Sequence, residues 1–244
     1  VPGHGSAPYG SSNALQPLVE ALHGLFTTPM PVDVSDEWRE FVAGLDLDPD
    51  LAEELVDPDR VDAAIDRLAV DNPAFARYVH AATHLTVSPN KMEGGVKVNV
   101  VPDDAKADID LRALPGMDRD FVDQHLRKAM GAAADHVELI PIDDHPALTS
   151  PRGNPLWDAI VDGLEERTGS RRVVPALMTV ATDARFYRRR GSVAYGVGLF
   201  DDRMDFGEFL SLFHGHDERV SVESVVRTTH LLDSVLARFG ALTA

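Results

Sequence analysis

The sequence contains no cysteine among its 244 residues. This absence excludes disulfide bonds and thiolate catalysis, and it leaves histidine, aspartate and glutamate as the side chains that could hold a metal ion. The sequence also has no apolar run long enough to span a bilayer, and residues 1–4 do not have the character of a signal peptide. We therefore expect a globular cytoplasmic protein.

Positive charge is scarce. The chain has 23 Lys and Arg residues against 40 Asp and Glu residues, which gives a formal net charge of −17. A chain this acidic repels phosphate backbones and anionic lipids, so we expect neither nucleic acid nor a membrane among its partners. The simplest interpretation of the charge itself is a solvated acidic surface.

The first part of the chain changes from helical to alternating hydrophobic periodicity. Helical spacing and start signals predict helices over 14–26, 36–44, 50–56, 59–69, 72–82 and 118–131. Alternation predicts strands over 84–88, 96–100, 108–112 and 137–140, with the middle two turning at 102–104. With a short first strand at the start of the chain, this order is typical of a ferredoxin-like α+β sandwich, in which helices cover an antiparallel sheet.

The pattern restarts at about residue 147, where we place a domain boundary. Helices over 154–167 and 221–239 flank two short apolar strands at 173–175 and 192–198. In the last helix we expect one stripe to face inward, formed by Val222, Val225, Val226, Thr229, Leu232, Leu236 and Phe239. Two or three strands do not make a stable parallel sheet, so this part resembles half of a layered α/β domain.

The densest group of chemically useful side chains is the loop 213–219. His214 could bind Zn²⁺ through one ring nitrogen while Glu218 orients the ring from its other side. The alternative is a solvated surface loop, because His214 and His216 alone do not complete a zinc site, which needs three or four protein ligands.

His4 is a second candidate, because the glycines on both sides of it would let the backbone approach a ligand closely. The alternative is an ordinary loop histidine. Ser6 is a weaker candidate for a nucleophile, since the sequence contains no G-x-S-x-G elbow.

Three further side chains could bind a substrate. Asn99 could hold a carbonyl group, and Arg112 and Arg185 could each bind a carboxylate through two parallel donors. The alternative for Arg112 is a salt bridge to Asp110 or another neighbour, and Arg185 has the same two interpretations.

Several segments together resemble the M20 metallopeptidases, a family that includes aminoacylases, carboxypeptidases and related amidohydrolases. The segments are GHGSAPYGSSNAL at 3–15, NVVPDDAKADIDLRALPG at 99–116, ATDARF at 181–186, YGVG at 195–198 and HGHDERV at 214–220. Each is modest alone, and their common order makes the resemblance specific. The pair ATDARF and HGHDER is most similar to the aminoacylase branch.

The resemblance implies a domain organisation and a set of partners. Residues 1–146 would be a lid or dimerisation domain with a helical insertion at about 31–82, and 147–244 would be the C-terminal part of a zinc-binding catalytic α/β domain. The protein would be a homodimer that associates through this lid, with two Zn²⁺ ions in each intact active site.

The resemblance also implies roles for single residues. His214 would be the last metal ligand, and His4 would polarise the scissile carbonyl. Asn99, Arg112 and Arg185 would bind the substrate, an N-acyl amino acid or short peptide with a free carboxylate.

The other metal ligands and the glutamate general base of the family precede the lid, and this sequence starts at the lid. We therefore expect the chain by itself to be incomplete and inactive in hydrolysis. The alternative is a non-catalytic dimerisation or binding module, that is, a truncated or degenerate member of the family.

Overall fold

A computed structural model describes residues 3–204, 206–213 and 216–243. The chain forms two compact units, one made of Val1–Asp33 and His84–Ala147 and the other of Val34–Thr83 and Leu148–Ala244. By contacts alone, the helical segment that we expected within the first domain therefore groups with the C-terminal part of the chain. The assignment of 1–146 and 147–244 as functional domains stays a prediction.

The first unit is built on two short antiparallel pairs. Strand β2 (Thr86–Gly94) pairs with β4 (Ala105–Arg112), and β1 (Gly3–His4) pairs with β3 (Val100–Val101). The expected strand over 96–100 is reduced to β3, because Gly95 turns the chain with φ +74° and Val96 and Val98 are exposed. The strand expected over 137–140 was also wrong, since that segment is irregular.

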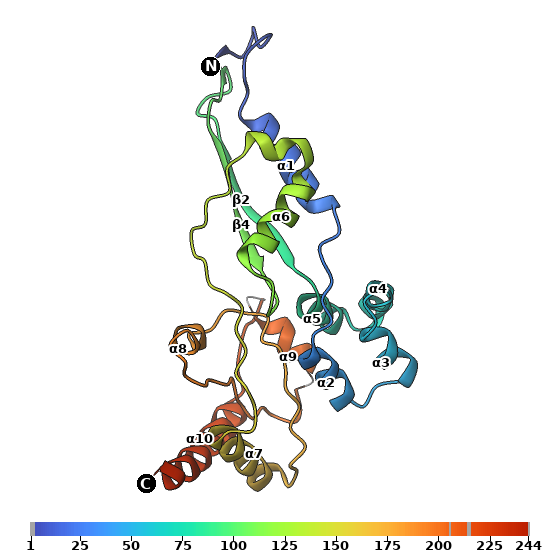
Figure 1. Cartoon of the computed structure of the whole chain (residues 1–244), viewed down its shortest axis with the longest axis vertical. Helices are drawn as coiled ribbons and strands as arrows, with labels where there is room; N and C mark the ends of the chain where they lie inside the picture. The colour runs from blue at the N-terminus through green and yellow to red at the C-terminus, as the bar shows by residue number, and fades with distance from the viewer. Residues whose placement is uncertain (1–2, 205, 214–215, 244) are drawn as a thin grey trace. The chain divides into compact units, whose positions relative to one another are not determined.

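Helices cover the β2–β4 ribbon of this unit (Figure 1). They are α1 (Leu15–Thr27), α6 (Arg119–Met130) and the 3₁₀ helix η1 (Gly131–His136). Gly24 allows α1 to lie against α6, because a Cβ atom there would be 2.1 Å from the carbonyl oxygen of Ala129. The core of the unit lies between these helices and the ribbon and includes Ala21, Leu25, Leu85, Leu126 and Met130.

Four short helices open the second unit. They are α2 (Asp36–Gly44), α3 (Pro49–Leu55), α4 (Val61–Asp71) and α5 (Pro73–Thr83), so the four predicted helices are confirmed to within about two residues at each end. Local capping explains the success, since Ser35 and Asp48 accept hydrogen bonds from the first turns of α2 and α3. Fully buried Trp38 stacks on Phe41 and donates to the carbonyl of Leu55 at 2.7 Å.

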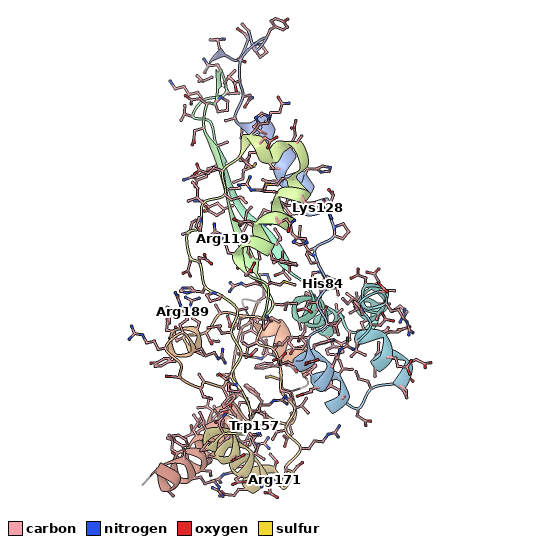
Figure 2. The ribbon with its side chains drawn as sticks, viewed as in Figure 1. His84, Arg119, Lys128, Trp157, Arg171 and Arg189 are labelled. Atoms are coloured by element: carbon pink, nitrogen blue, oxygen red, sulfur yellow. The ribbon has the colours of Figure 1, made fainter. Side chains whose placement is uncertain are left out.

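The remainder of the second unit is centred on α7 (Pro155–Thr168) and α10 (Val222–Thr243), with α8 (Ala184–Arg188) and α9 (Phe206–Leu212) between them in the chain. The first two pack closely at Gly163, where a Cβ atom would lie 3.1 Å from Val235. Trp157 of α7 meets the ring of Tyr195 edge-on, and Arg171, just past the helix, forms ion pairs with Asp162 and Glu165. Trp157 and Arg171 are labelled in Figure 2.

The predicted inward face of the last helix was wrong except at Phe239, which is partly buried against the cluster between α7 and α10. Val222, Val225, Leu232 and Leu236 are exposed, whereas Leu231 and Val235 are buried against α7. The helix carries apolar residues on two sides, so spacing alone does not identify the buried one.

The strands expected at 173–175 and 192–198 were also wrong, because within the described ranges neither segment pairs with another strand. Side chains bind part of the second segment instead. The amide of Ala194 donates to Ser150 Oγ at 3.1 Å, and Arg188 donates to the carbonyl of Ala194 at 2.6 Å. Over the described part of the chain, no helix is both long and apolar enough to cross a membrane.

Candidate functional site

His4 and Asn99, two of the predicted site residues, meet at one place in the first unit. His4 pairs with Val100 in the β1–β3 ladder, and the amide of Gly5 donates to the carbonyl oxygen of Asn99 at 2.8 Å. A Cβ atom on Gly5 would lie 3.3 Å from the Asn99 backbone, so the glycine permits this close approach. Residues 95 positions apart in sequence thus form one short polar edge.

A tight turn fixes the backbone around His4. The amide of Ala7 donates to the carbonyl of His4 at 2.9 Å, which closes the four-residue turn 4–7. The imidazole is exposed, and its Nδ1 atom lies 2.7 Å from Ser6 Oγ and 3.2 Å from the Ser6 amide nitrogen. The ring is therefore held by the turn that carries it.

Arg112 lies at the other end of the β2–β4 ribbon. It is the last residue of β4 and pairs with Thr86, whereas the loop that carries Asn99 precedes Ala105, the first residue of β4. Seven steps along a strand correspond to roughly 23 Å. The guanidinium forms an ion pair with Asp110, with Nε 2.8 Å from Oδ1 and a hydrogen bond from Nη2 to Oδ2 at 2.9 Å, which is the salt bridge that we named as the alternative.

Arg185 belongs to the second unit, where it is the second residue of α8. Its guanidinium carbon lies 4.8 Å from the centre of the Phe186 ring, a cation–π contact. Phe186 and the following Tyr187 are both exposed.

His214, the predicted metal ligand, lies outside the described residues. After it the chain passes through Asp217 in the left-handed region, with φ +60°. Arg219 donates to the carbonyl of Asp217 at 3.1 Å and to the carboxylate of Glu208 in α9 at 3.0 Å. Across the ranges that the structure covers, no three His, Asp or Glu side chains are grouped to hold a metal ion.

A family model, described as the peptidase dimerisation domain of M20 proteins, matches residues 1–138. The chain belongs to the M20 peptidase family. This confirms the resemblance that the five segments indicated.

The chain is also similar in sequence to individual M20 enzymes. Human aminoacylase-1 is 28% identical over 162 residues, which make up 65% of this chain and 38% of the relative. A succinyl-diaminopimelate desuccinylase from Caulobacter sp. strain K31 is 31% identical over 158 residues, 62% of this chain and 37% of the relative. The chain thus spans about two fifths of the length of these relatives.

A solved structure of an M20 family metallo-carboxypeptidase from Sulfolobus solfataricus has a similar fold. Its TM-score is 0.54 at 14% identity, and the match covers 98% of this chain and 59% of the other. The likeness confirms an α/β fold of the M20 kind. The finer arrangement, a ferredoxin-like lid followed by half of a catalytic domain, stays a prediction.

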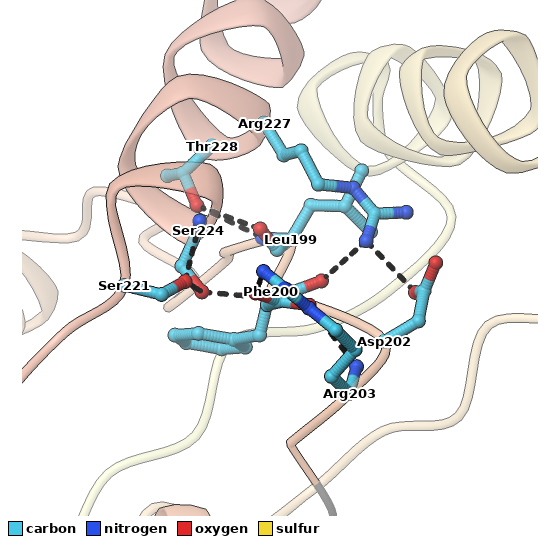
Figure 3. Close-up of polar contacts among 9 residues, drawn as sticks. Leu199, Phe200, Asp202, Arg203, Ser221, Ser224, Arg227 and Thr228 are labelled. Carbon is cyan, nitrogen blue, oxygen red and sulfur yellow. Dashed lines mark hydrogen bonds and ion pairs between the residues drawn. The ribbon is translucent and has the colours of Figure 1, made fainter.

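The second unit of this M20 chain also contains a polar network that sequence reasoning missed (Figure 3). Thr228 Oγ1 on α10 accepts from the amide of Leu199 at 3.0 Å and lies 3.2 Å from its carbonyl oxygen. Ser224 accepts from the amide of Asp201 at 2.9 Å, and Arg227 donates to the carbonyl of Phe200 at 2.9 Å. One helix thus binds three successive residues of an unpaired segment, just before α9 and the loop 213–219.

Asp201 adds charge to this network. Its carboxylate accepts two hydrogen bonds from the Arg203 guanidinium, at 2.9 and 2.6 Å, and these hold the pKa of Asp201 well below its usual range. Asp201 is therefore ionised at neutral pH, and its carboxylate is paired with the guanidinium of Arg203.

Proposed function

We propose that this M20 chain forms the lid and the C-terminal catalytic part of a zinc-dependent hydrolase that cleaves the amide bond of an N-acyl amino acid or a short peptide with a free carboxylate. The names of the relatives support this reaction class, since they are an aminoacylase, a desuccinylase and a metallo-carboxypeptidase. The observation that carries the proposal is the meeting of His4 and Asn99 at one polar edge.

His4 supplies an N–H donor that stabilises the negative charge developing on the substrate carbonyl oxygen. Asn99 lies on the paired segment, where its backbone carbonyl accepts from the Gly5 amide, and we assign its side-chain amide as a donor to the same substrate carbonyl group or to the acyl oxygen. Arg112 and Arg185 bind the free carboxylate through the two-donor fork that arginine presents. For Arg112 this requires the exchange of Asp110 for the substrate carboxylate.

The ribbon length supports a homodimer as the active form. The scissile carbonyl and the carboxylate of an N-acyl amino acid are only a few bonds apart. In one chain, His4 pairs with the segment that leads into the first residue of β4, whereas Arg112 is the last residue of β4, and the strand between these two ends is roughly 23 Å long. If both residues contact one substrate, they come from two copies of the chain. The match to a dimerisation domain supports the same conclusion.

The zinc ion in this proposal is inferred only from membership of the M20 family. The described residues do not by themselves form a fitting zinc site, and His214 lies outside them. We therefore assign no step to the metal and derive only what His4, Asn99 and the two arginines do.

The test is kinetic and uses the full-length product of the gene, supplied with Zn²⁺, on a panel of N-acetyl and N-succinyl amino acids. Replacing His4 by alanine removes one donor to the oxyanion, so we expect kcat to fall by about 10²–10³ with a smaller change in KM. The matched control is His23→Ala, which removes an exposed histidine of α1 in the same unit. Equal kcat values in the wild type and His4→Ala would exclude His4 from the reaction.

A second candidate is a non-catalytic dimerisation module. It is favoured by the family match to a dimerisation domain. A full-length product that dimerises, yet hydrolyses no member of the panel with any divalent metal, supports this candidate over the hydrolase.

A further inference from the structure

Ser6 makes two contacts with a single atom of the His4 ring. Its hydroxyl oxygen lies 2.7 Å from Nδ1, and its backbone amide donates to the same Nδ1 at 3.2 Å. Both contacts occur inside the turn that the Ala7 amide closes on the His4 carbonyl. Their combination determines which ring nitrogen carries the proton.

The backbone amide of Ser6 determines the tautomer of His4, because the amide hydrogen is fixed in the peptide plane and can only be donated. A neutral imidazole has one protonated nitrogen and one acceptor nitrogen. Since Nδ1 receives the Ser6 amide hydrogen, Nδ1 is the acceptor and the ring proton lies on Nε2. The Ser6 hydroxyl can then also donate to Nδ1, which agrees with its short 2.7 Å distance.

We propose that Ser6 is a positioning residue, which fixes His4 as the Nε2–H tautomer and directs that N–H away from the turn. The Nε2–H group is then the donor available to an external acceptor such as a substrate carbonyl. The role in catalysis rests on the proposed function, whereas the tautomer assignment rests only on the contacts of the turn.

The surroundings explain why the arrangement is stable in an exposed loop. The β1–β3 ladder fixes His4, and the Gly5 amide is bonded to the Asn99 carbonyl. The His4–Gly5 peptide is therefore held at both its N–H and its C=O group, and the Ser6 amide that follows it does not depend on the serine side chain. The hydroxyl supplies the shorter of the two contacts and is the part that mutation can remove.

The direct experiment is ¹⁵N NMR of the full chain labelled at its histidine rings, with the His4 signals assigned by their loss in His4→Gln. We expect the wild type to show Nδ1 unprotonated and hydrogen-bonded, and Nε2 protonated. In Ser6→Ala, Nδ1 should stay unprotonated because the amide donor remains, and its signal should move part of the way toward that of an unbonded ring nitrogen because the hydroxyl contact is lost. In Ser6→Thr the signal should stay near the wild-type position. A protonated Nδ1 in the wild type, or an unmoved signal in Ser6→Ala, would overturn the proposal.

The matched control is Ser11→Ala. Ser11 belongs to the same N-terminal segment, and its hydroxyl donates to the carbonyl of Pro8 at 2.6 Å. This variant removes a loop hydrogen bond without removing a donor to His4, so the Nδ1 signal should not move. An equal shift in Ser11→Ala would show that general loosening of the loop, and not Ser6, governs the ring.

The kinetic arm uses the full-length product. Ser6→Ala should lower kcat about tenfold, the factor that corresponds to one hydrogen bond of ordinary net strength, with KM nearly unchanged and with recovery in Ser6→Thr. If the NMR signals behave as expected and kcat is unchanged in both Ser6→Ala and His4→Ala, the proposed role of His4 in hydrolysis fails while the tautomer assignment stands. If Nδ1 is protonated, the inference about Ser6 fails whatever the kinetics show.

Discussion

At the scale of single residues, the hydroxyl of Thr228 bonds to both backbone groups of Leu199, which no neighbouring strand satisfies in the described part of the second unit. Thr228→Val keeps the shape of the side chain and leaves a partly buried N–H and C=O without a partner. We expect the free energy of unfolding to fall by about 1–3 kcal/mol, measured by urea denaturation.

The adjacent residue provides the control for that substitution. Thr229 is exposed, and its hydroxyl donates to the carbonyl of Val225 within α10. Thr229→Val should change the free energy of unfolding by no more than about 0.5 kcal/mol. Equal losses in the two variants would show that the cost arises from valine in the helix and not from Leu199.

The same pair of threonines marks a limit of sequence analysis. Periodicity selected Thr229 for the buried face, and the structure buries the neighbouring side of the helix with Leu231 and Val235. The candidate site residues stay a prediction; what the structure adds is that Gly5, one of the two glycines beside His4, permits a close approach to the Asn99 backbone. That the chain brings position 99 to position 4 depends on a strand pairing that local patterns do not specify.

At the scale of elements, the contact between α1 and α6 depends on Gly24. A Cβ atom there would lie 2.1 Å from the carbonyl oxygen of Ala129, which is backbone and cannot rotate away. Alanine normally stabilises a helix interior by about 0.5–1 kcal/mol relative to glycine. In Gly24→Ala we expect the clash to dominate, with a net loss of about 1–3 kcal/mol in the free energy of unfolding.

Gly240 in α10 allows the same substitution in open space, since a Cβ atom there meets nothing within 4 Å. Gly240→Ala should therefore leave stability unchanged or raise it by up to about 1 kcal/mol. The two variants have identical chemistry and opposite expected signs in thermal or urea unfolding. A stabilised Gly24→Ala protein would show that α1 and α6 do not approach as closely as the structure indicates.

Elements were predictable where their signals are local. Helices α2, α3 and α7 are capped by Ser35, Asp48 and Asn154, whose side chains accept hydrogen bonds from the first turn. The segments 173–175 and 192–198 have the composition of buried strands, and the structure does not pair them. A strand forms only when a second backbone satisfies its hydrogen bonds, so composition alone does not decide whether one is present.

At the scale of the whole molecule, the dominant property is the net charge of −17 per chain. The proposed homodimer would bring two strongly negative chains together, and their repulsion would oppose association. Salt screens this repulsion, because the Debye length falls from about 10 Å at 0.1 M to about 3 Å at 1 M ionic strength. Repulsion between exposed charges a Debye length or more apart is therefore weakened most.

We accordingly expect the dimer dissociation constant to decrease by about tenfold or more between 0.05 and 0.5 M NaCl, measured by sedimentation equilibrium. Sucrose at matched osmolality is the control, since it alters water activity without screening charge. A dissociation constant that rises with salt would contradict the expectation and would instead indicate an interface held by ion pairs. The sign of this dependence therefore distinguishes association through an apolar or backbone-paired lid from association through complementary charge, because only the second is weakened by screening.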